Sequence, residues 1–88
     1  MVYEVKLRGT ATNDYGIKSG VNSTKLVYAS DEAEASQVAK KRFEADYRRD
    51  FNPKSLEIDV AEVRWTSISD DTEEEQRAFC KKYGYVTA

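Results

Sequence analysis

The chain has 88 residues, of which 14 are basic and 16 acidic, and its formal net charge is −2. This length predicts a single small domain spanning residues 1–88. The near balance of charge argues against a protein that lives on phosphate backbones, because such proteins usually carry a clear basic excess. It also argues against an acidic mimic of nucleic acid, which needs a far larger negative field.

The composition predicts a thin core. Leu, Ile, Val and Phe supply only 17 of the 88 residues, but the small net charge favours a folded chain over a disordered one. A domain of this size buries about 60–65% of the surface that its unfolded chain exposes. A homodimer that thickens the core is compatible with this composition.

Residues suited to catalysis and to metal binding are scarce. The chain has no His, which removes the usual catalytic base and the commonest zinc ligand. Cys80 is the single cysteine, so no disulfide forms within the chain. It lies beside Lys81 and Lys82, which would lower its pKa at an exposed site, although a buried filler role is the stronger interpretation. We expect no enzymatic activity, no cofactor and no metal.

No segment resembles a signal peptide or reaches the ~20 apolar residues of a membrane span. The single cysteine also fits a reducing compartment. We therefore expect a cytoplasmic protein that does not contact membranes.

At the N-terminus, Tyr3, Val5 and Leu7 alternate with charged residues, which predicts a strand with one buried face. The segment 10–23 is rich in Asn, Asp, Ser and Gly. It is either one long loop with Tyr15 at its tip or an extended hairpin that turns near residues 13–16, and the residues alone leave both alternatives open.

Residues 24–29 predict a second strand, followed by a long helix. Asp31 and Glu34 form a capping box at the start of this helix, and Asn52-Pro53 ends it. Between them runs a helical stripe of apolar residues, namely Ala35, Val38, Ala39, Phe43 and Tyr47.

Residues 55–66 predict a third strand with an irregularity. The apolar phase of Leu56, Ile58 and Val60 slips by one residue to that of Val63 and Trp65, which is the pattern of a β-bulge. The alternative is a strand that is buried on both faces near its end.

The tail from Ser69 predicts a second, shorter helix. Its acidic start and basic end match the helix dipole, and Gly84 lies where a left-handed cap is expected. Ala78, Phe79 and Tyr83 would form its buried edge. Capping also accounts for the acidic cluster at the start of this helix, which lacks the spacing of a calcium loop.

These elements predict an α+β fold of order β-β-α-β-α. The outward side chains of the first strand, Lys6 and Arg8 among them, complement Glu57 and Asp59 of the third. The first strand is therefore expected in the centre of a three-stranded antiparallel or mixed sheet of order 2-1-3. The long helix would pack on one face, and the uncovered second strand would invite pairing.

The first functional hypothesis is a small non-enzymatic module that binds a larger protein as its regulator or inhibitor. Small proteins of phages and mobile elements often have this profile. A tyrosine among Ser, Gly and Asn is typical of adaptable binding loops. The predicted binding residues are Asn13, Asp14, Tyr15 and Lys18.

The alternative hypothesis is nucleic-acid binding through a basic helix face. This face would consist of Lys41, Arg42, Arg48 and Arg49. The interspersed acids Glu44, Asp46 and Asp50 favour a solvated helix face instead.

Overall fold

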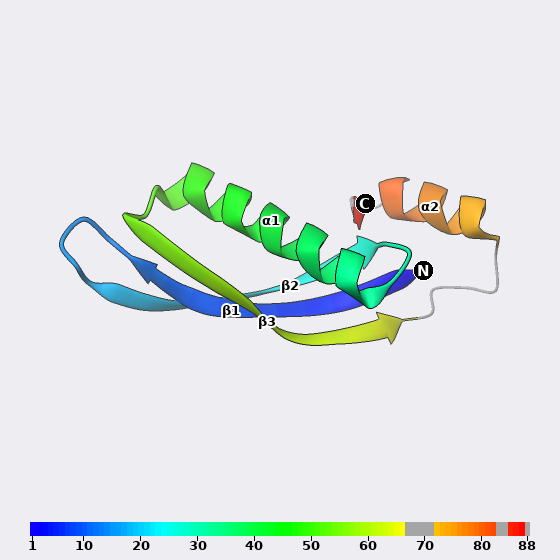
Figure 1. Ribbon diagram of the computed structural model, residues 1–88. Coiled ribbons are helices and arrows are strands. Elements are labelled where there is room, and N and C mark those ends of the chain that lie inside the picture. The colour runs from blue at the N-terminus through cyan, green and yellow to red at the C-terminus, as the bar shows by residue number, and fades with distance from the viewer. Residues whose placement is uncertain (67–71, 83–84, 88) are drawn as a thin grey trace.

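A computed structural model describes residues 1–66, 72–82 and 85–87. The fold is α+β, with a mixed sheet and two helices (Figure 1). In chain order the elements are β1 (Val2–Thr12), β2 (Lys18–Tyr28), α1 (Glu32–Phe51), β3 (Ser55–Thr66), α2 (Glu73–Lys82) and β4 (Val86–Thr87).

The sheet has four strands in the order β3-β1-β2-β4. As the charge pattern predicted, β1 lies between β2 and β3 and is antiparallel to both. The prediction of three strands and of a β-β-α-β-α order was wrong, because β4 follows α2 and pairs in parallel with Val27 and Tyr28 at the end of β2. A strand of two residues has no period by which a sequence pattern can reveal it.

Residues 10–23 form the extended hairpin, and the long-loop alternative was wrong. The two strands pair without interruption from Val2 opposite Tyr28 to Thr12 opposite Lys18. β2 therefore begins at Lys18, six residues before the predicted start. Its first half carries few apolar side chains and is mostly exposed, so backbone pairing holds it rather than burial.

The core lies between α1 and one face of the sheet, which we call the helix side. Tyr3, Val5 and Leu7 of β1 are buried there against Ala35, Ala39 and Phe43 of α1, together with Val27 and Ile58 from the neighbouring strands. The small alanine side chains let the helix lie close to the strands. This confirms the predicted stripe of α1 and the predicted buried face of β1.

The predicted β-bulge is present in β3. Val60 lies opposite Leu7 and Glu62 lies opposite Lys6, so Ala61 is the extra residue. The shift restores Val63 and Trp65 to the helix side and turns Ala61 and Glu62 to the opposite, outer face. The ion pair of Lys6 is consequently with Glu62, at 3.5 Å, and not with the predicted Glu57 or Asp59.

Both predicted ends of α1 are confirmed. The Asp31 side chain accepts a hydrogen bond from the backbone N–H of Glu34 at 2.8 Å, and the Glu34 carboxylate accepts one from the N–H of Ser30 at 3.1 Å. Asn52 ends the helix in the left-handed conformation, with φ of 43°.

α2 packs at the other end of the molecule from the hairpin turn, near the N-terminus (Figure 1). Its buried residue is Cys80, which contacts Val2 and Tyr28 in a second, smaller cluster. The prediction that Ala78 and Phe79 form the buried edge was wrong, since both are exposed. The residue of α2 that becomes buried is the one that contacts Val2 and Tyr28, the last pair of the β1–β2 ladder, and not the most apolar side chains of the helix.

Other predicted features of this tail, Ser69 to Asp71, Tyr83 and the Gly84 cap, lie outside the described residues. Thr72 caps α2, with its hydroxyl accepting from the N–H of Glu75 at 3.3 Å. None of the helices in the described segments has the length and apolar character needed to cross a membrane.

The close approach of β1 and β3 at Gly9 gives a test of the fold. A Cβ atom added at Gly9 would collide with the main-chain carbonyl oxygen of Glu57, whereas a Cβ at Gly20 of β2 would meet nothing within 4 Å. We expect Gly9→Ala to lower the free energy of unfolding by about 1–3 kcal/mol. The matched Gly20→Ala control should stay within about 0.5 kcal/mol of the wild type. Urea denaturation followed by circular dichroism measures both, and equal stabilities would contradict the pairing of Gly9 with β3.

Candidate functional site

The turn of the β1–β2 hairpin is a tightly bonded structure. The Asn13 side-chain oxygen accepts hydrogen bonds from the N–H groups of Tyr15 and Ile17, at 2.9 and 3.0 Å. The Asn13 N–H donates to the Ile17 carbonyl, and the Gly16 N–H donates to the Asn13 carbonyl, both at 3.0 Å. Gly16 supplies the positive φ, 78°, that the turn requires. The turn is therefore ordered by its own backbone, as an Asx-type motif should be.

This ordered turn presents apolar side chains to solvent. Tyr15 is 89% exposed and Ile17 is 60% exposed. Phe51, the last residue of α1, is 69% exposed. All three line one depression of about 280 Å³ between the hairpin turn and the C-terminal end of α1, together with Tyr47 and Pro53. Side chains that are far apart in the sequence thus form one apolar surface.

The α1 side of this surface continues the core outward. The ring centroids of Phe43 and Tyr47 are 6.1 Å apart, and those of Tyr47 and Phe51 are 4.7 Å apart. Phe43 is buried, Tyr47 is half-buried and Phe51 is exposed. One helical row of aromatic rings therefore leads from the interior to the surface, and its packing fixes the orientation of Phe51.

Two backbone contacts hold the halves of the surface in place. The N–H of Asn52 bonds to the Arg48 carbonyl at 3.0 Å and closes α1. The N–H of Lys54 bonds to the carbonyl of Thr12 at 2.8 Å, which ties the connection after α1 to the end of β1. The Lys54–Thr12 hydrogen bond therefore joins the segment after α1 to the base of the hairpin turn.

Three of the four predicted loop residues belong to this surface. Asn13, Asp14 and Tyr15 line the depression. Lys18 does not: as the first residue of β2 it lies opposite Thr12 and, with Thr12 and Glu57, lines a separate recess. The structure therefore places the four predicted residues around two depressions, and their role in binding stays a prediction.

Sequence reasoning missed Ile17, Tyr47 and Phe51 as surface residues. Phe51 extends the predicted stripe by four residues beyond Tyr47, and this spacing was a signal that the row of rings continues to the helix end. The proximity of Phe51 to the hairpin turn arises from the tertiary fold, and the spacing of residues along the helix does not predict it.

The predicted basic face of α1 is partly neutralised. Asp46 accepts from Arg42 at 3.3 Å and lies 3.5 Å from Arg49 and 3.7 Å from Lys25 of β2. Arg49 also pairs with Asp50 at 3.1 Å. Two of the four predicted cations, Arg42 and Arg49, are thus paired within α1, and Asp46 also links the helix to β2 through Lys25, which supports the solvated-face interpretation. Nucleic-acid binding itself stays a prediction.

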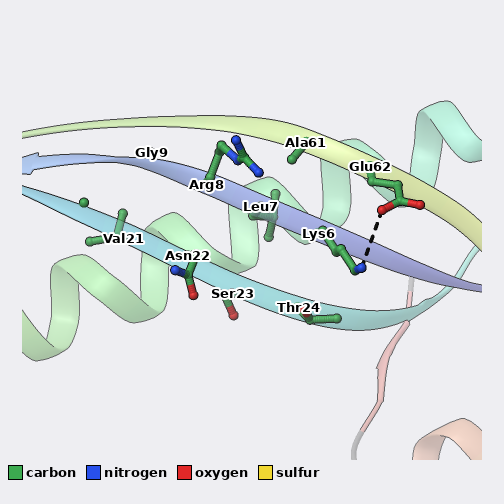
Figure 2. Close-up of a pocket in the computed structure, with 11 residues that line it drawn as sticks. Lys6, Leu7, Arg8, Gly9, Val21, Asn22, Ser23, Thr24, Ala61 and Glu62 are labelled. Carbon is green, nitrogen blue, oxygen red and sulfur yellow. Dashed lines mark ion pairs between the residues drawn. The ribbon is translucent and has the colours of Figure 1, made fainter.

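The outer face of the sheet is a broad, polar concavity of about 730 Å³ (Figure 2). Lys6 and Arg8 rise from β1, Asn22 from β2 and Glu62 from β3, and the Lys6–Glu62 ion pair spans two strands. Opposite charges alternate across it, so it presents neither a basic nor an apolar surface.

Trp65 and Tyr28 do not lie side by side on the outer face. Trp65 lies opposite Tyr3, which is on the helix side, whereas Tyr28 lies opposite Val2, in the other phase. The base-stacking pair considered from the sequence is therefore not formed by these two residues.

Cys80 has the environment of a packing residue. It is fully buried against Val2 and Tyr28, and burial raises the pKa of its thiol above the ordinary value. This direction is opposite to the one expected from Lys81 and Lys82. Within the described residues, no group of three or more potential ligands of the His, Cys, Asp and Glu types gathers into a metal site.

Comparison with known proteins adds no assignment. No protein-family model, curated protein or solved structure matches the chain. The functional argument therefore depends on the geometry of the molecule.

The burial of Cys80 predicts slow thiol chemistry. Native protein should react with Ellman's reagent at least about 100-fold more slowly than protein in urea, because reaction requires local opening. A thiol whose pKa is raised by folding stabilises the native state fully below its unfolded pKa of about 8.5, and this stability is lost as the pH rises through the native pKa. Urea midpoints between pH 7 and 9 should therefore fall for the wild type and change less for Cys80→Ala. A fast native reaction would contradict the burial.

Proposed function

We propose that the protein is a small, non-enzymatic module that binds another protein through the end of its hairpin. The binding surface, which we call the tip surface, consists of Tyr15, Ile17, Tyr47 and Phe51. The observation that carries the proposal is the gathering of apolar side chains from the hairpin turn and from α1 around one depression, with Tyr15, Ile17 and Phe51 exposed.

Exposure of this kind favours binding over a structural role. Single exposed apolar residues are common on protein surfaces and need no explanation, whereas contiguous ones mark interaction sites. The chain has a thin core, yet it leaves Tyr15, Ile17 and Phe51 largely in water. Tyrosine and phenylalanine are also enriched in the central residues of protein interfaces, where they bury a large area with few rotatable bonds.

Rigidity of the tip surface supports the same conclusion. Association loses affinity when flexible side chains and loops must be ordered. The Asn13 hydrogen bonds fix the turn and the Tyr47 ring fixes Phe51, so much of that ordering is complete before a partner arrives.

The position of the tip surface suits a regulator or inhibitor of a larger protein. The hairpin turn projects past the C-terminal end of α1 (Figure 1), which allows it to enter a cavity or groove of a partner. Asp14 is the one charged residue among those that line the depression, and the other lining residues are uncharged. The complementary site on the partner should therefore be a concave apolar pocket with a polar rim.

The test is a comparison of matched variants on the captured partner. Affinity purification with mass spectrometry identifies proteins retained by the wild type. Calorimetry with the purified partner then compares Tyr15→Ala and Phe51→Ala with Lys18→Ala, whose side chain is exposed at the same end of the hairpin but outside the tip surface. Each tip variant should weaken binding by about tenfold or more, as residues at the centre of an interface do, while Lys18→Ala should leave the affinity within about threefold.

The variants must keep the fold for this comparison to be informative. Tyr15 and Phe51 are exposed, so their replacement should change the unfolding free energy by less than about 1 kcal/mol. Equal affinities for the wild type, Tyr15→Ala and Phe51→Ala would remove the tip surface from the proposal. Loss of binding in the Lys18→Ala variant alone would move the site to the outer face.

A further inference from the structure

β3 forms one edge of the sheet along its entire length. It pairs with β1 on one side, and among the described residues no strand lies on its other side (Figure 1). The open edge expected from the sequence was that of β2, but β4 covers the end of that strand. An uncovered strand of twelve residues presents a row of unpaired N–H and C=O groups, which can pair with another strand.

The exposed part of β2 is a poorer candidate for pairing. From Lys18 to Leu26 it contains no acidic residue, its Lys25 is already paired with Asp46 of α1, and it contains Gly20. β3 has β-branched and aromatic residues on its helix side and charges of both signs on its outer face. It is therefore the edge with both the apolar content and the charge complementarity to recognise a second strand.

The bulge restricts how β3 can pair with a copy of itself. Before the bulge, odd-numbered residues face outward, and after it, even-numbered residues do. Ala61 and Glu62 both lie on the outer face (Figure 2). In an antiparallel pair of identical strands, side chains of the same face meet along the whole strand only when the two-fold axis passes between Ala61 and Glu62. In any other register, some outward side chains lie opposite inward ones.

This register also places opposite charges against each other. Asp59 of each chain would lie opposite Arg64 of the other, so two symmetric ion pairs would form on the outer face in place of the long Arg64–Glu62 contact of 3.9 Å within each chain. On the helix side the opposing residues are apolar. The opposing pairs are Glu57 with Thr66, Ile58 with Trp65, Asp59 with Arg64, Val60 with Val63, and Ala61 with Glu62.

The exposure of Trp65 points to the same surface. It is 59% exposed although its cross-strand neighbour Tyr3 is only 4% exposed. Trp65 lies on the helix side of β3, which is the edge strand, and Ile58 of a second β3 would lie opposite it in this register.

We infer that the chain forms a two-fold symmetric homodimer through antiparallel pairing of β3 with β3. The two sheets join into one continuous sheet, and both α1 helices lie on the same side of it. Asp59 and Arg64 set the register and Trp65 becomes buried. The dimer uses a different surface from the tip surface and does not depend on it.

The first experiment measures mass and tryptophan environment together. Multi-angle light scattering is measured at protein concentrations from about 10 μM to about 1 mM, so that even a dimer with a Kd near 1 mM is detected. The mass should rise with concentration from 10.0 kDa towards twice that value. Trp65 is the single tryptophan of the chain, so its emission should shift to shorter wavelength over the same concentration range. A monomeric mass at the highest concentration overturns the inference, and so does a dimer without a change in emission.

The second experiment uses charge reversal at the two positions. The Asp59→Arg variant has arginine at positions 59 and 64, and the Arg64→Asp variant has aspartate at positions 59 and 64. Each variant alone should dimerise at least about tenfold more weakly than the wild type, because like charges oppose each other twice. An equimolar mixture of the two should recover the dimer, since every opposing pair is then of opposite sign.

The mixture controls for folding, because each variant carries the same internal change alone and in the mixture. Recovery in the mixture confirms the register, and failure to recover overturns it. Tyr15→Ala should dimerise as the wild type does, so failure of the tip surface and failure of the dimer are separate results.

Discussion

The fold depends on β1 having an antiparallel partner along both of its sides. Its helix-side residues Tyr3, Val5 and Leu7 are the centre of the core, and its two backbone ladders extend from the first residues to Thr12. The chain has few aliphatic residues, so the backbone ladder of β1 with β2 continues to Thr12 and Lys18, beyond the part of β2 that is buried under the helix. The backbone carbonyl that collides with a Cβ at Gly9 shows how closely the strands approach there.

The sheet is longer than the helix that covers it, and this mismatch produces the tip surface. A helix of twenty residues is about 30 Å long, whereas strands of eleven residues span about 36 Å before the turn is added. The molecule accordingly measures 50 × 22 × 15 Å. Since α1 starts close to one end of the strands, the hairpin turn extends past the other end of the helix (Figure 1), and Tyr15 and Ile17 remain largely in solvent.

Much of the fold could be predicted because local rules and tertiary structure agreed. The alternation of β1, the capping box of α1 and the phase slip near Ala61 each have a direct physical cause within a few residues of sequence. Charge complementarity correctly placed β1 in the centre, even though the bulge changed the partner of Lys6 to Glu62.

Other features depend on contacts that no short segment encodes. β4 is too brief to have a pattern, and α2 buries Cys80 because of what the sheet presents to it. The candidate site shows the same limit. Tyr15 was identified from the composition of its segment, but its neighbour in space, Phe51, comes from a helix whose end the fold alone brings to the turn.

The separation of the tip from the core has an evolutionary consequence. Side chains at positions 15 and 17 are mostly in water, whereas the turn itself is held by main-chain groups and by Asn13. Replacing those two side chains should therefore leave folding almost unaffected. A lineage that keeps Asn13 and Gly16 is free to diversify the neighbouring positions quickly, and it can acquire new specificities while inheriting the same scaffold.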